Sequence, residues 1–421
     1  MTYLKFMHVL RKIYPALDKM LPEKESFIGR LGLQQRVLPS YRVPFFDMLA
    51  SACAGGMSLF AGQPGAEESI ASGEPQVAKY APARNIHLLK GPLYLCYQRG
   101  LLDWLADWNP DALIVEANPR YISTPAAVQW MQRRGRPVLG WGLGSPPRFD
   151  QAQRKLSGPL RLRSPVPAPV PSRSRDGTAL AQAGQALAGF RQNGWTRFLN
   201  RFDGLIAYSQ RGAGEYAALG FPREKIFVAH NAVLPAPTAA PAHRLLTIDR
   251  VSILFVGRLQ ARKRVDSLLR ACAEMPAPGP RLVIVGDGPE RGDLEQVARQ
   301  VYPSAQFIGA KHGDELKPYF AEADLFVLPG TGGLAVQEAM SHALPVIVAK
   351  GDGTQDDLVR PENGWQVPPG DYGALVATMR EALSDVGRLR QMGKESFRIV
   401  SEEINLEKMV EVFVDALNSI L

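Results

Sequence analysis

The sequence predicts an α/β fold with two doubly wound, Rossmann-like domains. Three observations carry this prediction: short apolar runs alternate with helical patterns, the alternation stops in a proline- and alanine-rich stretch after residue 233, and it restarts at residue 251. Strands that alternate with helices form parallel sheets covered by helices on both faces. A chain of 421 residues is long enough to build two such domains.

In the first half, apolar runs bounded by Gly, Pro or charged residues mark the expected strands. The run 36–39 reads as a strand end that leads into a helix at about residues 43–54. Further strands are expected at residues 57–60, 112–116, 136–141, 202–208 and 225–229, with a helix at 125–134. Residues 156–178, rich in proline, serine and arginine, interrupt the pattern and predict a mobile insertion.

The second half repeats the alternation after an expected linker at residues 234–248, where prolines stand among alanines. Strands are expected at residues 251–256, 282–285, 305–308, 325–328 and 345–349, and helices at 265–275, 335–341, 372–385 and 406–421. We therefore expect an N-terminal domain over residues 1–233 and a C-terminal domain over 249–403. A last helix within residues 404–421 is expected to pack back towards the N-terminal domain.

The formal net charge of +8 suits a phosphate-rich substrate, an anionic membrane surface or nucleic acid. Nucleic acid is not expected, because no aromatic–basic interleaving, recognition-helix pattern or zinc motif is present. The three cysteines are scattered, which argues against a disulfide framework or a structural zinc site and fits a reducing compartment. Without a signal-peptide pattern or a long uncharged apolar run, a cytoplasmic location is expected.

Chemistry is expected at the carboxyl ends of the strands, where open parallel sheets bind their ligands. Gly257 and Arg258 follow the strand at 251–256, and Lys263 comes five residues later. A glycine that admits close backbone approach, with two cations near it, suits a diphosphate. The same residues would also suit a solvated basic turn.

Two glycine-rich turns follow. Gly286 and Gly288 come directly after the strand at 282–285, where they suit either an approach to phosphate or a plain tight turn. Gly332, Gly333 and Leu334 stand where a helix begins, so their N–H groups would face an anion, or the loop would serve tight packing alone.

Glu338 lies four residues after Leu334 on the same expected helix, among apolar neighbours. A carboxylate there is costly unless it is paired or bound, and a ribose diol would be a suitable partner. A solvent-facing or ion-paired glutamate is the alternative.

Together these segments resemble the retaining, family 4 glycosyltransferases, which have the GT-B fold of two Rossmann-like domains facing each other across a cleft. The resemblance covers residues 250–385 well. It rests on residues 255–259 (FVGRL) with Lys263, 284–289 (IVGDGP), 307–309 (FIG), 323–329 (ADLFVLP), 333–340 (GLAVQEAM) and 344–347 (LPVI). Residues 37–46, 207–209 and 227–231 are more loosely similar to the acceptor domain of that family.

The resemblance implies that Arg258 and Lys263 hold the diphosphate of a nucleotide-sugar donor and that Glu338 contacts its ribose. It also implies that residues 332–334 present N–H groups to the distal phosphate. Many members carry a second glutamate eight positions before Glu338, where this chain has Gly330 in a shortened loop. Leu143 stands where relatives often have a histidine.

On the acceptor side, Ser40, Arg42 and Glu116 are candidates because they follow expected strands, although a capping or ion-paired role suits Glu116 as well. His230 is expected to be structural or interdomain, and no general base is identified. The acceptor is expected to be a hydroxyl compound, including a lipid-linked saccharide. Basic segments at residues 1–42 and 148–176 suggest either a solvated surface or docking on an anionic leaflet.

We therefore expect a retaining glycosyltransferase of cell envelope polysaccharide synthesis that uses no cofactor. Metal-independent chemistry is expected because no Asp-X-Asp motif occurs. A catalytically inactive nucleotide-sugar-binding partner subunit is the alternative. A nicotinamide-dependent oxidoreductase is disfavoured, because the glycines of residues 286–292 depart from the dinucleotide fingerprint.

Overall fold

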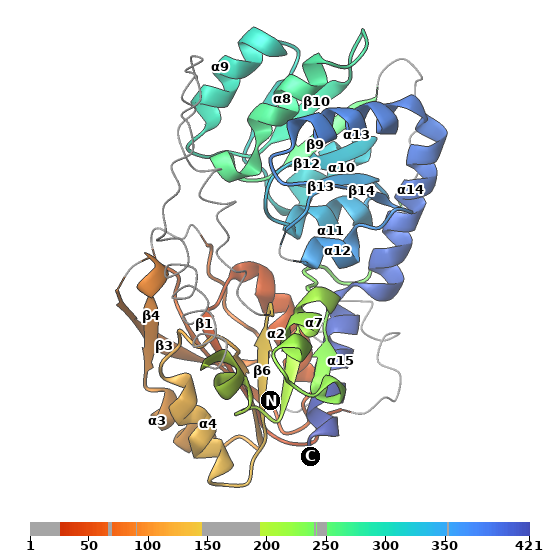
Figure 1. The fold of residues 1–421 in the computed structure, drawn as a ribbon. Coiled ribbons are helices and arrows are strands. Elements are labelled where there is room, and N and C mark those ends of the chain that lie inside the picture. Colours follow the sequence, from red (N-terminus) through yellow and green to blue (C-terminus); the bar gives the residue numbers. More distant parts are fainter. Residues whose placement is uncertain are drawn as a thin grey trace, which may run out of the picture.

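The computed structural model describes residues 26–65, 70–89, 91–144, 194–239, 241, 251–351 and 353–421. Within them, two α/β units stand one above the other, each with its own sheet (Figure 1). The expected insertion at 156–178 and most of the expected linker at 234–248 lie outside the described residues. The domain boundaries that we expect from the sequence stay a proposal.

The N-terminal sheet has eight strands in the order β4-β3-β2-β1-β5-β6-β7-β8. Only β3 and β4 pair antiparallel. The strands are β1 (Leu31–Val37), β2 (Met57–Gly62), β3 (Lys79–Leu88), β4 (Leu95–Arg99), β5 (Ala112–Glu116), β6 (Val138–Gly142), β7 (Gly204–Ala207) and β8 (Ile226–Val228). The helices described here are α2 (Val43–Ser51), α3 (Leu101–Trp108), α4 (Thr124–Gln132) and α7 (Gln210–Ala218).

The C-terminal sheet is fully parallel, with six strands in the order β11-β10-β9-β12-β13-β14. The strands are β9 (Ser252–Val256), β10 (Arg281–Val285), β11 (Gln306–Gly309), β12 (Leu325–Leu328), β13 (Val346–Ala349) and β14 (Gly364–Val367). The helices described after β9 are α8 (Val265–Ala273), α9 (Arg291–Val301), α10 (Lys317–Glu322), α11 (Leu334–Ser341), α12 (Thr354–Leu358), α13 (Tyr372–Ser384) and α14 (Val386–Arg398), followed by α15 (Leu406–Ser419), which packs on the N-terminal domain.

The expected strand bounds at β5 and β12 are confirmed, and the other expected strands overlap observed ones. The strands β3, β4 and β14 were not expected from the sequence, nor were the helices α3, α7, α9, α10, α12 and α14. Strand β3 contains Pro82 and is exposed along much of its length, so it lacks the apolar run that marks a buried strand.

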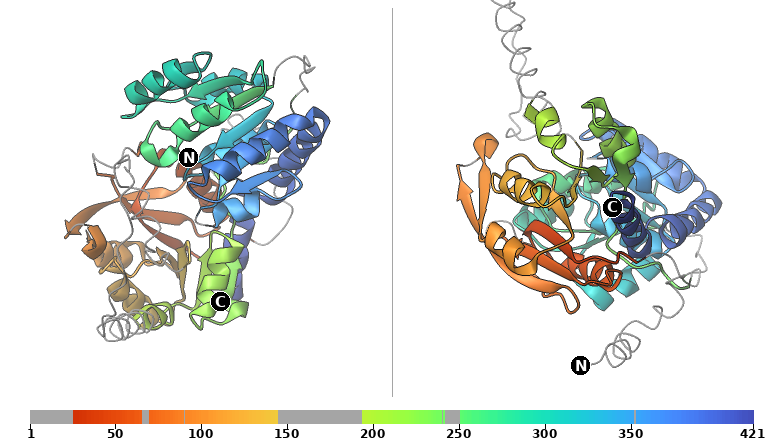
Figure 2. Two further views of the ribbon diagram at one scale, coloured as in Figure 1. Left: turned by 45° about the horizontal axis from the view of Figure 1, so that its top comes forward. Right: turned by 90° about the horizontal axis from the view of Figure 1, so that it is seen from below.

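The last helix, α15, belongs to the core of the N-terminal domain. Figures 1 and 2 show it, in dark blue, beside the green segment that holds α7 and β8. The ring of Phe413 lies 4.9 Å from that of Phe45 on α2 and 5.0 Å from that of Trp141 on β6, measured between centroids. All three side chains are buried. The chain therefore crosses between the domains twice and returns to the first.

The carboxyl edges of the two sheets face each other. A Cβ on Gly353, which follows β13, would lie 3.0 Å from the hydroxyl of Ser209, which follows β7. The Gln210 N–H donates to the Asp357 carboxylate at 3.0 Å, and the Arg211 guanidinium donates to the Gly351 carbonyl at 3.0 Å. Residues that follow strands in one domain therefore meet their counterparts in the other.

Phe413→Ala is expected to destabilise the N-terminal domain by about 3–5 kcal/mol, because it leaves a cavity among buried aromatic rings. Urea unfolding followed by near-ultraviolet circular dichroism measures this loss. The control, Leu421→Ala, removes a side chain that is 73% exposed and should leave stability nearly unchanged. Equal stability of the two variants would show that α15 does not support this core.

Candidate functional site

Strands β9 and β12 are neighbours at the centre of the C-terminal sheet, and the chain leaves them towards opposite edges. Such a switch point opens a crevice at the carboxyl ends of the two strands. The loop after β9 carries Gly257, Arg258 and Lys263, and the loop after β12 carries Gly330 and Gly332. The two loops predicted to bind a donor therefore lie side by side.

Gly330 makes the contact between these loops possible. A Cβ at this position would overlap the carbonyl oxygen of Arg262 and the backbone of Lys263. The neighbouring Thr331 N–H donates to that same Arg262 carbonyl at 3.0 Å. Position 330, where the family resemblance leads one to expect a glutamate, is thus a backbone contact here, with no room for a side chain.

Lys263 is half-buried with its ammonium directly against Gly332, where an added Cβ would meet Nζ. Burial, helped by the neighbouring Arg262 charge, lowers the pKa of Lys263 to about 8. Among the described residues, no carboxylate pairs with this ammonium within 4.0 Å. A desolvated cation without a counter-ion is a ready site for an anion.

Arg258 is exposed and forms no hydrogen bond or ion pair with any part of the chain that the structure describes. Its guanidinium is thus free to bind a ligand. It stands next to Gly257, whose N–H donates to the Val285 carbonyl at 3.0 Å. That bond fixes the end of β9 to the end of β10.

Gly286 and Gly288 serve close packing. A Cβ on Gly286 would overlap the Gly257 carbonyl, and one on Gly288 would overlap the Leu259 carbonyl. The Gly286 N–H already donates to Gly309 at 2.8 Å, and the Gly288 N–H donates to the Asp287 carboxylate at 2.6 Å. Both N–H groups thus have partners within the protein, which favours the plain-turn alternative for this segment.

Helix α11 begins next to Lys263. Its N-cap, Gly333, offers no side-chain cap, so the first turn keeps its dipole and N–H groups available for an anion. The Gly332 carbonyl, in turn, accepts a hydrogen bond of 3.1 Å from Gln355. One face of this site thus comes from α12, which sequence analysis did not identify.

Glu338 is half-buried on α11, one turn after Leu334, whose side chain is exposed. Burial raises the pKa of Glu338 above its ordinary value. No residue in the described part of the chain donates a hydrogen bond to its carboxylate. The carboxylate is therefore open to hydroxyl donors.

The N-terminal domain places a polar cluster at its own switch point, between β1 and β5. The Arg36 N–H donates to the Glu116 carboxylate at 2.5 Å, and Gln34 accepts from the Glu116 N–H at 3.2 Å. Burial raises the pKa of Glu116 to about 7, although the Arg36 hydrogen bond and charge oppose this. The Arg36 side chain also hydrogen-bonds Tyr121. Of the acceptor-side candidates, Glu116 has the environment of a functional group.

Arg42 and Ser40 do not join that cluster. Arg42 is buried, donates to the Ala232 carbonyl at 3.3 Å and to the Asn231 side chain, and lies 5.4 Å from the centre of the Tyr208 ring. These contacts indicate that Arg42 holds residues 231–232, at the start of the first crossover between the domains, and does not contact the acceptor. Ser40 is exposed in a 3₁₀ turn after β1.

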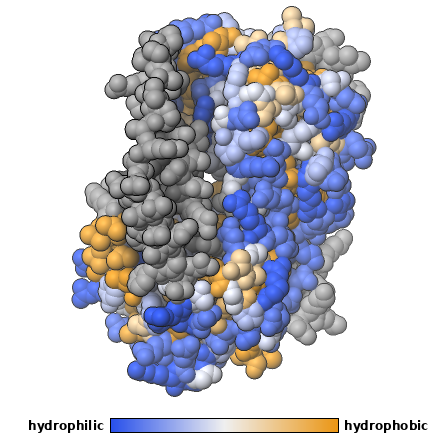
Figure 3. All heavy atoms as spheres, in the orientation of Figure 1, coloured by the Kyte–Doolittle hydropathy of each residue, from blue (hydrophilic) through white to orange (hydrophobic). Residues whose placement is uncertain are grey.

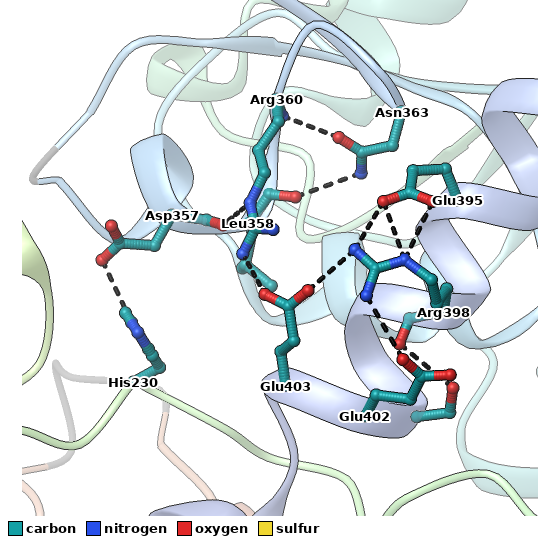
Figure 4. A network of polar contacts seen from close by, with 10 residues as sticks. His230, Asp357, Leu358, Arg360, Asn363, Glu395, Arg398, Glu402 and Glu403 are labelled. Carbon is teal, nitrogen blue, oxygen red and sulfur yellow. Dashed lines mark hydrogen bonds and ion pairs between the residues drawn. The ribbon is translucent and has the colours of Figure 1, made fainter.

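His230 is an interdomain residue. Its Nδ1 lies 3.1 Å from the Asp357 carboxylate on α12, as Figure 4 shows. Beyond α12, Arg360 donates to Glu403 at 2.6 Å, and Glu403 also pairs with Arg398 at 2.7 Å. These ion pairs connect α12 to the second crossover, which leads into α15.

Gln337 was not predicted, although it is buried next to Glu338. Its carbonyl accepts from the Val233 N–H at 2.7 Å, and its amide donates to the Ile404 carbonyl at 2.7 Å. Val233 lies on the first crossover and Ile404 on the second. The helix that carries Glu338 is thus attached to both connections between the domains. In the sequence, the only sign of this role is an amide side chain on a mostly apolar helix.

Comparison with known proteins agrees with this geometry. Residues 250–385 match the family model described as glycosyl transferases group 1. A GDP-mannose-dependent alpha-mannosyltransferase of Mycobacterium tuberculosis is 34% identical over 186 residues, which cover 42% of this chain and 47% of that protein. A lipopolysaccharide core biosynthesis glycosyltransferase of Rhizobium meliloti is 23% identical over 327 residues, covering 75% and 87%.

Among solved structures, an Anabaena protein crystallised with UDP superimposes with a TM-score of 0.64 and 16% identity, over 93% of this chain and 100% of that one. This similarity establishes the GT-B fold. The chain spans less than half the length of several curated relatives that it matches at about one third identity.

No helix among the described residues has the length and apolarity needed to span a membrane. Nor do three or more of their His, Cys, Asp or Glu side chains gather in a way that could hold a metal ion.

Gly330→Ala is expected to lower the stability of the C-terminal domain by about 1–3 kcal/mol, because the new Cβ forces two backbone segments apart. Urea unfolding is the measurement. The matched control is Gly292→Ala on α9, where a Cβ would meet nothing within 4 Å. The loop contact would be refuted if the two variants unfolded at the same urea concentration.

Proposed function

We propose that this chain, whose residues 250–385 match the family model of glycosyl transferases group 1, transfers a sugar from a nucleoside diphosphate sugar to a hydroxyl acceptor, with retention of the anomeric configuration. The donor would occupy the switch point of the C-terminal sheet. The acceptor would bind at the facing edge of the N-terminal sheet. No metal or cofactor takes part in this proposal.

The observation that carries the proposal is the environment of Lys263. Its ammonium is desolvated and lies against Gly332, where α11 begins, and Arg258 on the same loop after β9 has a free guanidinium. A leaving diphosphate gains negative charge as the glycosidic bond breaks. Fixed cations and helix N–H groups in a water-poor site stabilise that charge without further reorganisation.

Glu338 suits the ribose of the nucleotide. Its carboxylate is half-buried and accepts no hydrogen bond from the described residues, so two vicinal hydroxyls would satisfy it. The diphosphate would then contact the start of α11 and the ribose its second turn. In this arrangement Gly332, Gly333 and Leu334 face the distal phosphate.

On the acceptor side we assign Glu116 as the group that binds the reacting hydroxyl. A carboxyl whose pKa is near 7 accepts a proton at neutral pH more readily than an ordinary glutamate. We expect the acceptor to be a glycan or lipid-linked saccharide of the cell envelope, met at the cytoplasmic face of a membrane. The relative that acts in lipopolysaccharide core biosynthesis and the net charge of +8 support this choice.

One observation favours a second candidate, a protein that binds the donor without transferring the sugar. Gly330 stands where many relatives have a glutamate, and the backbone contact leaves no space for one. Gln355 on α12, which reaches Gly332, is the neighbouring polar group that would take over a contact to the donor sugar. Measured transfer separates the two candidates.

Arg258→Ala is expected to weaken donor binding about tenfold or more, because it removes a charge-assisted contact to the diphosphate. A thermal-shift screen of UDP- and GDP-sugars identifies the donor first, since a ligand of the folded state raises the melting temperature. Titration of the variant then measures the loss. The matched control is Arg299→Ala, an exposed arginine on α9. Full transfer and unchanged affinity in Arg258→Ala would refute the assignment.

Donor affinity is expected to fall as the pH rises above about 8, because free Lys263 then loses its proton. The diphosphate of a nucleotide sugar keeps its two negative charges there, because it is esterified at both ends and its remaining acid groups ionise far below neutral pH. Binding would raise the pKa of Lys263 and take up a proton. In the protein without donor, the folding stability contributed by Lys263 changes with pH in the opposite direction to donor affinity. Because the folded pKa lies below the ordinary 10.5, this residue adds stability as pH rises from about 8 to 10.5.

Isothermal titration between pH 7 and pH 9.5 checks the expected fall. Lys263→Arg keeps its charge over this whole range and should bind with a flat pH profile. A flat profile in the unsubstituted protein would contradict the role of Lys263.

A further inference from the structure

We propose that the hairpin of β3 and β4 is a membrane-docking surface, whose apolar tip enters an anionic lipid leaflet. The inference rests on the proposed function only for its purpose, which is to bring a lipid-borne acceptor to the site. Figure 3 shows hydrophobic residues gathered at the edge of the N-terminal domain where β3 and β4 lie.

The outer face of the hairpin changes from charged to apolar along its length. Antiparallel pairing places Arg84 opposite Arg99, and side chains two positions further on share the same face. The next rungs towards the tip, and the tip itself, carry large apolar side chains: Ile86 opposite Tyr97, Leu88 opposite Leu95, then Leu89 and Leu93. Leu89 is 61% and Leu93 is 67% exposed.

Charge on this segment has one sign. Residues 75–102 contain no Asp or Glu, whereas Lys and Arg occur four times. The paired arginines lie four residues from Leu88, or roughly 13 Å at the rise of a strand. Apolar side chains at the tip and guanidinium groups at that distance match the acyl boundary and the anionic headgroups of one leaflet.

The inner face of the hairpin is fixed to the body of the domain. Asn85 donates to the Arg36 carbonyl at 2.7 Å, and Gln98 donates to the Gln35 carbonyl at 3.0 Å. Arg36 in turn donates its N–H to Glu116. The hairpin therefore cannot move far without moving the polar cluster of the proposed acceptor site.

The tip of the hairpin extends past the carboxyl edge of the sheet, the edge at which the proposed acceptor site lies. Strand β3 runs parallel to β2 and pairs with it as far as Ala83, then continues to Leu88. The last five residues extend roughly 17 Å beyond that pairing, past the carboxyl edge of the sheet. Glu116 ends β5 at the same edge. A leaflet that takes up the tip would lie at the rim of the acceptor side.

A dimer of two copies through this face fits less well. The face would bury Arg84 and Arg99 without any carboxylate of its own segment to pair them, and unpaired buried charges are costly. Lipid phosphates supply the missing counter-ions.

The test compares full-length variants in co-sedimentation with vesicles of phosphatidylcholine containing phosphatidylglycerol. Leu89→Ser with Leu93→Ser is expected to weaken partitioning about tenfold or more, because less apolar area is buried. Arg84→Ser with Arg99→Ser is expected to weaken it by a similar factor, and only on vesicles that contain phosphatidylglycerol. The matched control is Ile28→Ser, which removes an apolar side chain that is 82% exposed. Ile28 precedes β1 and so lies at the amino ends of the strands, whereas the hairpin tip lies beyond their carboxyl ends.

A second measurement locates the contact. Leu89→Cys allows an environment-sensitive fluorophore to be attached there alone, because the three native cysteines are buried. The emission should shift to the blue on adding anionic vesicles, whereas the same label on Ile28→Cys should not respond. Absence of the shift, or unchanged sedimentation of the Leu89/Leu93 variant, would overturn the proposal. The proposal would also be overturned if analytical ultracentrifugation showed the unsubstituted protein to be a dimer and the Leu89/Leu93 variant to be a monomer.

Donor titration of the same variants keeps the two proposals separate. The leucine variant should bind nucleoside diphosphate sugars with unchanged affinity, because the hairpin is not part of the donor site. Failure of the proposed function would appear as no donor binding in any variant, with vesicle binding intact. Failure of the docking surface would leave donor binding intact and vesicle binding insensitive to the substitutions.

Discussion

The site depends on one backbone contact, in which Gly330 lies against residues 262 and 263. Because no side chain separates the two loops, the Lys263 ammonium is pressed against Gly332 beside the start of α11. The same closeness removes water from the ammonium and lowers its pKa. A larger residue at 330 would move the loops apart and return the cation to solvent, where it would attract a diphosphate only weakly.

Helix α11 connects that contact to the arrangement of the domains. Gln337 is hydrogen-bonded to both crossovers, and Glu338 on the same helix is the expected ribose contact. Asp357 on the following helix reaches His230 in the other domain. A ligand that shifts α11 therefore acts on the two segments about which the domains would move, which gives domain closure a physical link to donor binding.

Most strands could be predicted from the sequence because each is a short apolar run that ends in glycine, proline or charge. The β3–β4 hairpin could not, because its outer face is exposed and its pattern contains Pro82. At the site, the sequence brought Arg258, Lys263 and Glu338 to attention through spacing and residue type. It offered Gly286, Gly288 and Arg42 as candidate ligand contacts, with a plain turn as the alternative for the glycines. The structure shows close backbone packing at both glycines and hydrogen bonds to the first crossover for Arg42.

The sequence by itself determined where strands stop and which charged side chains follow them, since both depend on neighbours within a few residues. Only the tertiary structure decided which of these side chains meet. Gln337 and Ile404 are 67 residues apart, and Asn85 and Arg36 are 49 apart, yet each pair shares a hydrogen bond. Burial, which lowers the pKa of Lys263 and raises that of Glu116, arises from such distant contacts and from no local pattern.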